Sequence, residues 1–116
     1  MKFALLLTLA ALPLHAQVIS SNQVVTASWE RFSDRNQIMA NGRRFNPKAF
    51  CCATRLYALG THLLVTDAHN GLKVRVTVTD RPNSRYSERL DLSPAAFSVL
   101  NGLQIGICDV RCQVGR

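Results

Sequence analysis

The sequence predicts a compact all-β domain of the barrel type, and two observations support this prediction. Apolar and polar residues alternate over short runs, which is the pattern of strands with one buried face. Asn-Gly and Pro-containing turn signals separate these runs, and only the segment 93–100 has the signals of a helix. No repeat or linker divides the chain. We therefore expect one barrel of short strands with a single short helix.

The first sixteen residues have the pattern of a secretory signal peptide. Lys2 supplies a basic start, an apolar run extends from Phe3 to Leu14, and Ala16 is the small residue that a signal peptidase prefers. A run of about a dozen apolar residues is too short to span a bilayer. We expect a signal peptide at 1–16, a leader at 17–23 and the barrel at 24–114, in a periplasmic or secreted protein without a lipid-attachment cysteine or transmembrane segment.

The expected elements follow in chain order. The segments expected to contain strands are 24–29, 45–56, the two arms of a hairpin at 59–80, and 104–110. Asn41-Gly42 marks a turn between the first two. Ser93 can cap the helix, Pro94 suits its first turn, and Asn101-Gly102 supplies the stop signal.

The hairpin is the best-defined of these elements. Asn70-Gly71 is the dipeptide of a two-residue type I′ turn, in which both central residues take positive φ. Folding about that turn pairs Val65 with Val76 and Thr61 with Asp80.

Strand alternation then makes a prediction about Asp80. Val74, Val76 and Val78 share one face, and Asp80 continues that face at the mouth of the apolar interior. Partial desolvation favours the protonated carboxyl group, which can act as a general acid. The alternative is that Asp80 only ends a strand and starts the turn 80–83.

The cysteines predict disulfides. An even number of cysteines in a small exported chain is typical of cross-linked domains. We expect two bonds from the vicinal pair, Cys51 and Cys52, to Cys108 and Cys112, with the pairing left open. Their spacing is a poor match to a zinc site, and we expect no metal or cofactor.

The charge balance is basic. The formal net charge is +7, and removal of Lys2 with the signal peptide leaves 7 − 1 = +6. Outside the cytoplasm, this favours an anionic envelope polymer or membrane surface as partner rather than nucleic acid. The alternative is that the charge only keeps the protein soluble.

Seven short motifs, read in order, indicate a family. They are Ala27-Ser28-Trp29, Ala40-Asn41-Gly42-Arg43-Arg44-Phe45-Asn46, Leu59-Gly60-Thr61, Val65-Thr66, Asn70-Gly71, Val76-Thr77-Val78-Thr79-Asp80-Arg81 and Leu90-Asp91-Leu92-Ser93-Pro94-Ala95-Ala96. Together they resemble the RlpA-like double-psi β-barrel domain, also called septal ring lytic transglycosylase or rare lipoprotein A, and related to expansin barrels. The resemblance covers about 80 residues.

The resemblance implies a small six-stranded double-psi β-barrel with one short helix, exported and directed at cell-wall glycan. We expect the protein to be a monomer. Active members are lytic transglycosylases, which cleave the MurNAc–GlcNAc bond of peptidoglycan without water and leave a 1,6-anhydro end. Asp80 matches the position of the family's general acid, which then acts as base toward the C6 hydroxyl. This chemistry can use one carboxyl group, unlike ordinary glycoside hydrolysis.

Some positions depart from the family pattern. Arg43 replaces a Glu, Thr54 a His, and Glu30-Arg31 a Tyr-Gly pair, while Pro82-Asn83 replaces Gly-Pro. These losses favour a domain that binds peptidoglycan glycan strands with weak or absent lytic transglycosylase activity. The alternative is an active lytic transglycosylase with Asp80 as acid and base.

The remaining expectations concern other polar and aromatic residues. The residues expected to contact substrate are Arg43, Thr54, Arg81, Tyr86 and Trp29, although the core is the more common place for a tryptophan. We expect Asp91 near the helix N-terminus, and His62 and His69 on the surface.

Overall fold

The computed structural model of the protein describes residues 23–30, 37–82 and 89–115. The predicted signal peptide, most of the predicted leader, and Tyr86 lie outside these residues. The described elements are β1 (Val24–Trp29), β2 (Cys51–Ala53), β3 (His62–Asp67), β4 (Lys73–Asp80), β5 (Arg89–Leu92), α2 (Pro94–Leu100) and β6 (Ile107–Gly115). In this part of the chain no helix has the length and apolarity needed to cross a membrane.

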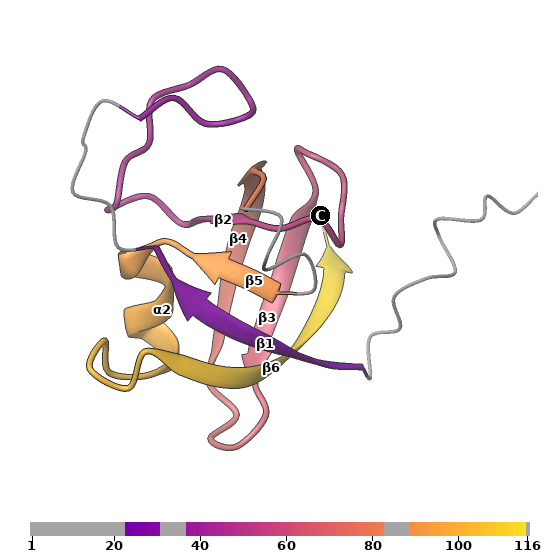
Figure 1. The fold of residues 1–116 in the computed structure, drawn as a ribbon. Helices are drawn as coiled ribbons and strands as arrows, with labels where there is room; N and C mark the ends of the chain where they lie inside the picture. The colour runs from indigo at the N-terminus through magenta and orange to yellow at the C-terminus, as the bar shows by residue number, and fades with distance from the viewer. Residues whose placement is uncertain (1–22, 31–36, 83–88, 116) are drawn as a thin grey trace, which may run out of the picture.

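The strands form a closed barrel in the order β1-β5-β2-β4-β3-β6 (Figure 1). The β1–β5 and β2–β4 pairs are parallel, and the other four neighbours are antiparallel. This confirms the predicted barrel with one short helix. The parallel pairs matter for function because they place segments more than 25 residues apart in the sequence side by side.

The β3–β4 turn differs from the prediction. Leu63 pairs with Val76 and Val65 with Val74, so the register is two residues away from the expected one. The Asp67 N–H donates to the Leu72 carbonyl at 2.8 Å, which leaves a four-residue loop. Asn70 lacks the positive φ that a type I′ turn requires. The type I′ prediction is therefore wrong.

The Asp67 side chain explains the wider loop. Its Oδ1 accepts hydrogen bonds from the backbone N–H groups of His69 and Asn70, at 2.8 and 3.0 Å. An aspartate that bonds its own following backbone stabilises a turn which the Asn-Gly signal alone does not predict. Because the register error is an even number of residues, the two faces of β4 stay as predicted. Val74, Val76, Val78 and Asp80 are all buried.

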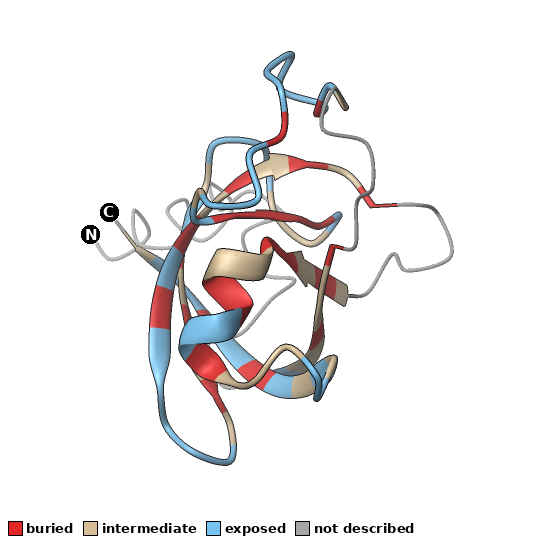
Figure 2. Ribbon diagram, turned by 90° about the vertical axis from the view of Figure 1, so that its left-hand side faces the viewer, coloured by how far each residue is buried: buried red, intermediate tan, exposed pale blue. Residues whose placement is uncertain are grey.

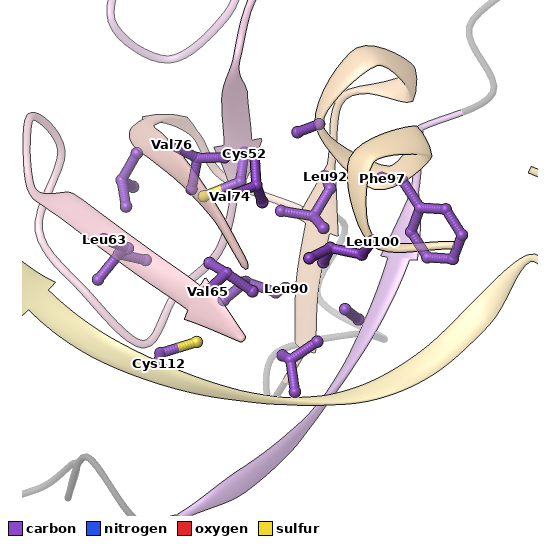
Figure 3. Packing of buried hydrophobic residues seen from close by; sticks show 14 residues of the cluster. Cys52, Leu63, Val65, Val74, Val76, Leu90, Leu92, Phe97, Leu100 and Cys112 are labelled. Atoms are coloured by element: carbon purple, nitrogen blue, oxygen red, sulfur yellow. The ribbon is translucent and has the colours of Figure 1, made fainter. Parts of the chain in front are cut away.

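The core fills the barrel and includes one face of α2. Buried side chains of the strands pack against the helix residues Phe97 and Leu100 (Figure 3). They include Leu63, Val65, Leu90 and Leu92. Figure 2 shows that one side of the helix is buried against the strands while the other side faces solvent.

The ends of α2 agree with the sequence signals. The Ser93 hydroxyl accepts the Ala96 N–H at 3.2 Å, and Pro94 occupies the first turn. The helix ends at Leu100, immediately before the predicted stop.

Two strands differ from the sequence prediction. The sequence analysis does not predict the strand at 89–92, because a run of only four residues carries little periodicity. The last strand begins at Ile107 rather than at residue 104, because a turn closed by the Ile105 N–H on the Gly102 carbonyl, at 3.0 Å, precedes it.

The cysteines also differ from the prediction. All four are free thiols. Adjacent strand residues point to opposite faces, so Cys51 packs with Met39 and Phe45 while Cys52 joins the barrel core with Cys112. Cys108 packs only partly buried against the core. The predicted pair of disulfides is therefore absent, and burial instead raises the pKa of the Cys112 thiol to about 12.

Candidate functional site

A shift in the β2–β4 register positions Asp80. Cys52 pairs with Val78, but the next residue, Ala53, pairs with Asp80, so β4 accommodates Thr79 as an extra residue. Irregularities of this kind redirect side chains and occur often beside active sites. Ala53 also pairs with Asp91 on the other side of β2. Asp80 and Asp91 therefore flank one small residue, roughly 10 Å apart at two strand spacings.

Asp80 is nearly buried and holds a neighbouring turn. Its exposed fraction is 8%. Oδ1 accepts the backbone N–H groups of Ala40 and Arg81, both at 2.8 Å. The Asn41 N–H donates to the Thr79 carbonyl at 3.1 Å, so the Ala40–Gly42 turn is fixed over the end of β4. The predicted inward position of Asp80 is confirmed.

Glu30 is a second buried carboxyl group at this site. It follows β1, its N–H donates to the Leu92 carbonyl at 2.8 Å, and its exposed fraction is 5%. Burial, and then the negative charges of Asp91 and Asp80, raise the pKa of Glu30 to about 9. Glu30 therefore carries a proton at neutral pH.

Asp91 completes the group of carboxyls. Its Oδ1 accepts the Ser28 hydroxyl at 2.8 Å, across the parallel β1–β5 pair that aligns the two residues. Burial raises the pKa of Asp91, and the charge of Asp80 adds to this effect. Asp91 lies two residues before the Ser93 cap, as expected, but its side chain bonds Ser28, and Ser93 caps the helix.

Two of the residues predicted to contact substrate, Thr54 and Arg81, hold the backbone next to Asp80. Thr54 has no exposed surface, and its hydroxyl donates to the Arg89 carbonyl at 3.0 Å and accepts the Leu56 N–H at 3.1 Å. The Thr54 N–H donates to the Asp80 carbonyl at 3.1 Å. The Arg81 guanidinium donates to the carbonyl oxygens of Thr54 and Tyr57. Both residues thus fix the segment after β2 against the end of β4.

The other predicted contacts lie in different surroundings. Arg43 is exposed in the turn that Asp80 holds, and its N–H donates to the Asn41 side chain at 3.0 Å. Trp29 packs partly buried against the core, with its indole N–H on the Leu103 carbonyl at 2.9 Å. The structure thus brings Asp80 together with the turn of Arg43, while Trp29 has a packing role.

Sequence reasoning missed Glu30 as a site residue. By sequence, Glu30 is only a departure from the family's Tyr, yet it lies two residues after Ser28, on the side of β1 that meets Asp91. Together with the β1–β5 pairing, this two-residue spacing predicts that Glu30 lies on the same side as Asp91.

The buried carboxyl groups of the described residues suit proton-transfer chemistry. Asp80 and Asp91 flank Ala53, and their charges help to raise the pKa of Glu30, which is protonated at neutral pH whereas a typical surface carboxyl is ionised. Pairs of titratable groups whose surroundings separate their pKa values are typical of acid–base sites. Among residues 23–30, 37–82 and 89–115, no group of three or more His, Cys, Asp or Glu could hold a metal ion.

Comparison with known proteins identifies the family. A family model described as "Lytic transglycolase" matches residues 22–112. A probable endolytic peptidoglycan transglycosylase RlpA from Nostoc is 39% identical over 75 residues, covering 65% of this chain and 20% of the relative. The Aquifex aeolicus protein of the same name is 36% identical over 90 residues, which cover 78% of this chain and 40% of the relative. The chain thus spans well under half the length of these relatives.

Solved structures agree on the fold. The Streptomyces papain inhibitor superposes with a TM-score of 0.64 at 22% identity, covering 84% of this chain and 99% of that one. A Clavibacter michiganensis expansin mutant in complex with cellohexaose superposes with a TM-score of 0.61 at 23% identity. The match covers 81% of this chain and 51% of that one. The chain therefore belongs to the lytic transglycolase family and is an RlpA-like double-psi β-barrel.

Proposed function

We propose that this domain is exported, binds peptidoglycan glycan strands, and cleaves them as a lytic transglycosylase at the site formed by Asp80 and Glu30. The observation that carries the proposal is the buried, protonated Glu30 beside Asp80. The family's Glu is lost at Arg43, but Glu30 supplies a carboxyl group from another position. The names of the relatives supply the substrate class.

In the proposed reaction, Asp80 transfers a proton to the glycosidic oxygen while the bond from that oxygen to C1 of MurNAc breaks. The C6 hydroxyl oxygen then bonds to C1, and its proton passes to the Asp80 carboxylate. The proton count is restored, and no water is consumed. Glu30 holds a proton at neutral pH, because burial and then the negative charges of Asp91 and Asp80 raise its pKa to about 9.

Binding without cleavage is the second candidate, and a specific observation favours it. Glu30 and Asp80 are each more than nine-tenths buried. Oδ1 of Asp80 already accepts hydrogen bonds from two backbone N–H groups. A carboxyl group so used can serve to fix the Ala40–Gly42 turn alone. The surface around this turn would then bind glycan without transferring a proton.

Incubation with purified sacculi separates the two candidates. The chain without residues 1–16 should release 1,6-anhydro-muropeptides, detected by mass spectrometry. Asp80→Asn retains an Oδ1 acceptor for both N–H groups but removes the titratable proton, so release should fall 10²–10⁴-fold with melting temperature and sacculus pelleting unchanged. Asp109→Asn, an exposed substitution, is the matched control.

Other outcomes decide against cleavage. If the wild-type chain pellets with sacculi but releases no anhydro product, the domain is a binder. If Asp80→Asn unfolds the domain, the carboxylate is a structural anchor of the turn, and the catalytic assignment to Asp80 loses its basis.

A further inference from the structure

The exposed cations of this chain lie in two groups. In the described part of the chain the exposed acidic residue is Asp109, whereas seven basic residues are exposed. One group lies in the segments on either side of β2 and consists of Arg43, Arg44, Lys48 and Arg55. The other comes from β4 and β6, the two neighbours of β3 in the barrel, and consists of Lys73, Arg75 and Arg111.

Strand register aligns the second group with exposed aliphatic side chains. Thr66 of β3 pairs with Lys73 on one side and with Arg111 on the other. Arg111 pairs in turn with Val24 of β1, which is 45% exposed. Leu72 precedes Lys73 at the β3–β4 turn and is 51% exposed. We call this region the basal surface, and it comprises Val24, Leu72, Lys73, Arg75 and Arg111.

The charge of the basal surface is positive. Leu64 of β3, on the same face as Thr66, pairs with Arg75, which places this cation one row further along β4. Asp109 lies at the margin, beyond the last β3–β6 pair, and its Oδ2 is 3.5 Å from Nε2 of His69. Three cations therefore face one carboxylate at the edge of the surface.

Cations and exposed aliphatic side chains on one surface suit an anionic phospholipid bilayer. Lysine and arginine side chains are attracted by the negative potential of anionic headgroups. Leucine and valine beside them can enter the boundary between headgroups and acyl chains. A soluble polyanion would use the cations alone and leave Leu72 and Val24 in water. The presence of both kinds of side chain in one row favours lipid.

We propose that the basal surface docks this domain on an anionic phospholipid bilayer and directs the Asp80 end of the barrel away from the lipid. Lys73 is the first residue of β4 and Asp80 the last, so 80 − 73 = 7 residue steps separate them by about 23 Å. The β3–β4 turn and the segment before β2 lie at opposite ends of the barrel (Figure 1). The Asp80 end thus stays open to glycan while the turn contacts lipid. The docking itself does not depend on the proposed cleavage.

Vesicle sedimentation tests the docking. The chain without residues 1–16 is used, because the apolar run 3–14 would itself bind lipid. The salt concentration is about 0.1 M, where the Debye length is about 10 Å. The protein should pellet with vesicles of phosphatidylglycerol and phosphatidylcholine at a ratio of about 3:7, and not with phosphatidylcholine alone.

Two double substitutions separate the basal surface from net charge. Lys73→Gln with Arg75→Gln should weaken the affinity for the anionic vesicles roughly 10–30-fold, about fivefold for each charge. Arg43→Gln with Lys48→Gln removes the same charge from the other group. This control should change the affinity less than about twofold, because its charges lie more than a Debye length from the lipid.

Tryptophan substitutions test the orientation with all charges intact, and they decide the question if a charge variant fails to fold. Leu72→Trp should shift its emission to shorter wavelength when anionic vesicles are added, because the indole leaves water. Leu59, which is 41% exposed, precedes Gly60, whose N–H donates to the Val78 carbonyl near the Asp80 end at 2.8 Å. Leu59→Trp is therefore the matched control and should show no shift.

Several results would overturn the inference. They are equal pelleting of the wild type with neutral and anionic vesicles, no pelleting with either, equal losses in the two charge variants, and a shift for Leu59→Trp but not for Leu72→Trp. If the Lys73 and Arg75 variant loses pelleting with sacculi but keeps it with vesicles, the surface binds a wall polymer, and the lipid assignment is wrong. Loss of vesicle binding with unchanged release of anhydro-muropeptides would support a docking surface separate from the Asp80 site.

Discussion

Replacement of Glu30 by glutamine should remove a pH-dependent loss of stability. Glu30 is 5% exposed, and burial, with Asp91 and Asp80 nearby, raises its pKa from 4.5 to about 9. The folded protein therefore holds a proton that the unfolded chain releases above pH 4.5. Unfolding releases this proton, so a rise in pH favours unfolding throughout the interval from about 4.5 to about 9.

The magnitude follows from the slope of this linkage. One proton released on unfolding changes the free energy of unfolding by about 1.4 kcal/mol for each pH unit. Between pH 5 and pH 8, Glu30 should cost the wild-type protein at most about 4 kcal/mol. Glutamine cannot ionise and resembles the protonated carboxyl in shape. At pH 5 the variant should match the wild type, and at pH 8 it should be more stable.

Urea unfolding of both proteins at pH 5 and pH 8 measures this difference. Comparison of variant with wild type at each pH cancels the titration of Asp67, Asp91 and the other groups that the two proteins share. If the difference in unfolding free energy is the same at both pH values, Glu30 is ionised in the folded protein. The proton-holding role of Glu30 in the proposed reaction would then be refuted.

Two further predictions concern the helix cap and the thiols. Ser93→Ala removes the cap on Ala96 and the 2.6 Å hydrogen bond to the Ala49 carbonyl, and should lower the free energy of unfolding by roughly 2–3 kcal/mol in a urea titration. The exposed Ser98→Ala in the same helix should change it by less than about 0.5 kcal/mol. Because the four cysteines are free, thiol titration in denaturant without reductant should find four reactive groups. A count of zero would restore the disulfide prediction.

The sequence alone determined the local features of this protein. The limits of β1, the cap and end of α2, and the buried face of β4 follow from turn residues, capping residues and period-two alternation, which act over a few neighbouring residues. The ordered motifs also predicted the family and hence the six-stranded barrel. These features required no knowledge of which strand lies beside which.

The tertiary structure decided the register of the hairpin, the state of the cysteines and the composition of the site. The Asp67 side chain moved the register of the hairpin by two residues, and the split of Cys51 from Cys52 across a strand removed the expected disulfides. Glu30 became a site residue only through the parallel β1–β5 pair, which brings it to Asp91 from 61 positions away in the sequence, the difference 91 − 30. The pKa of a carboxyl group depends on desolvation and on nearby charges. Both are set by residues that distant parts of the chain contribute.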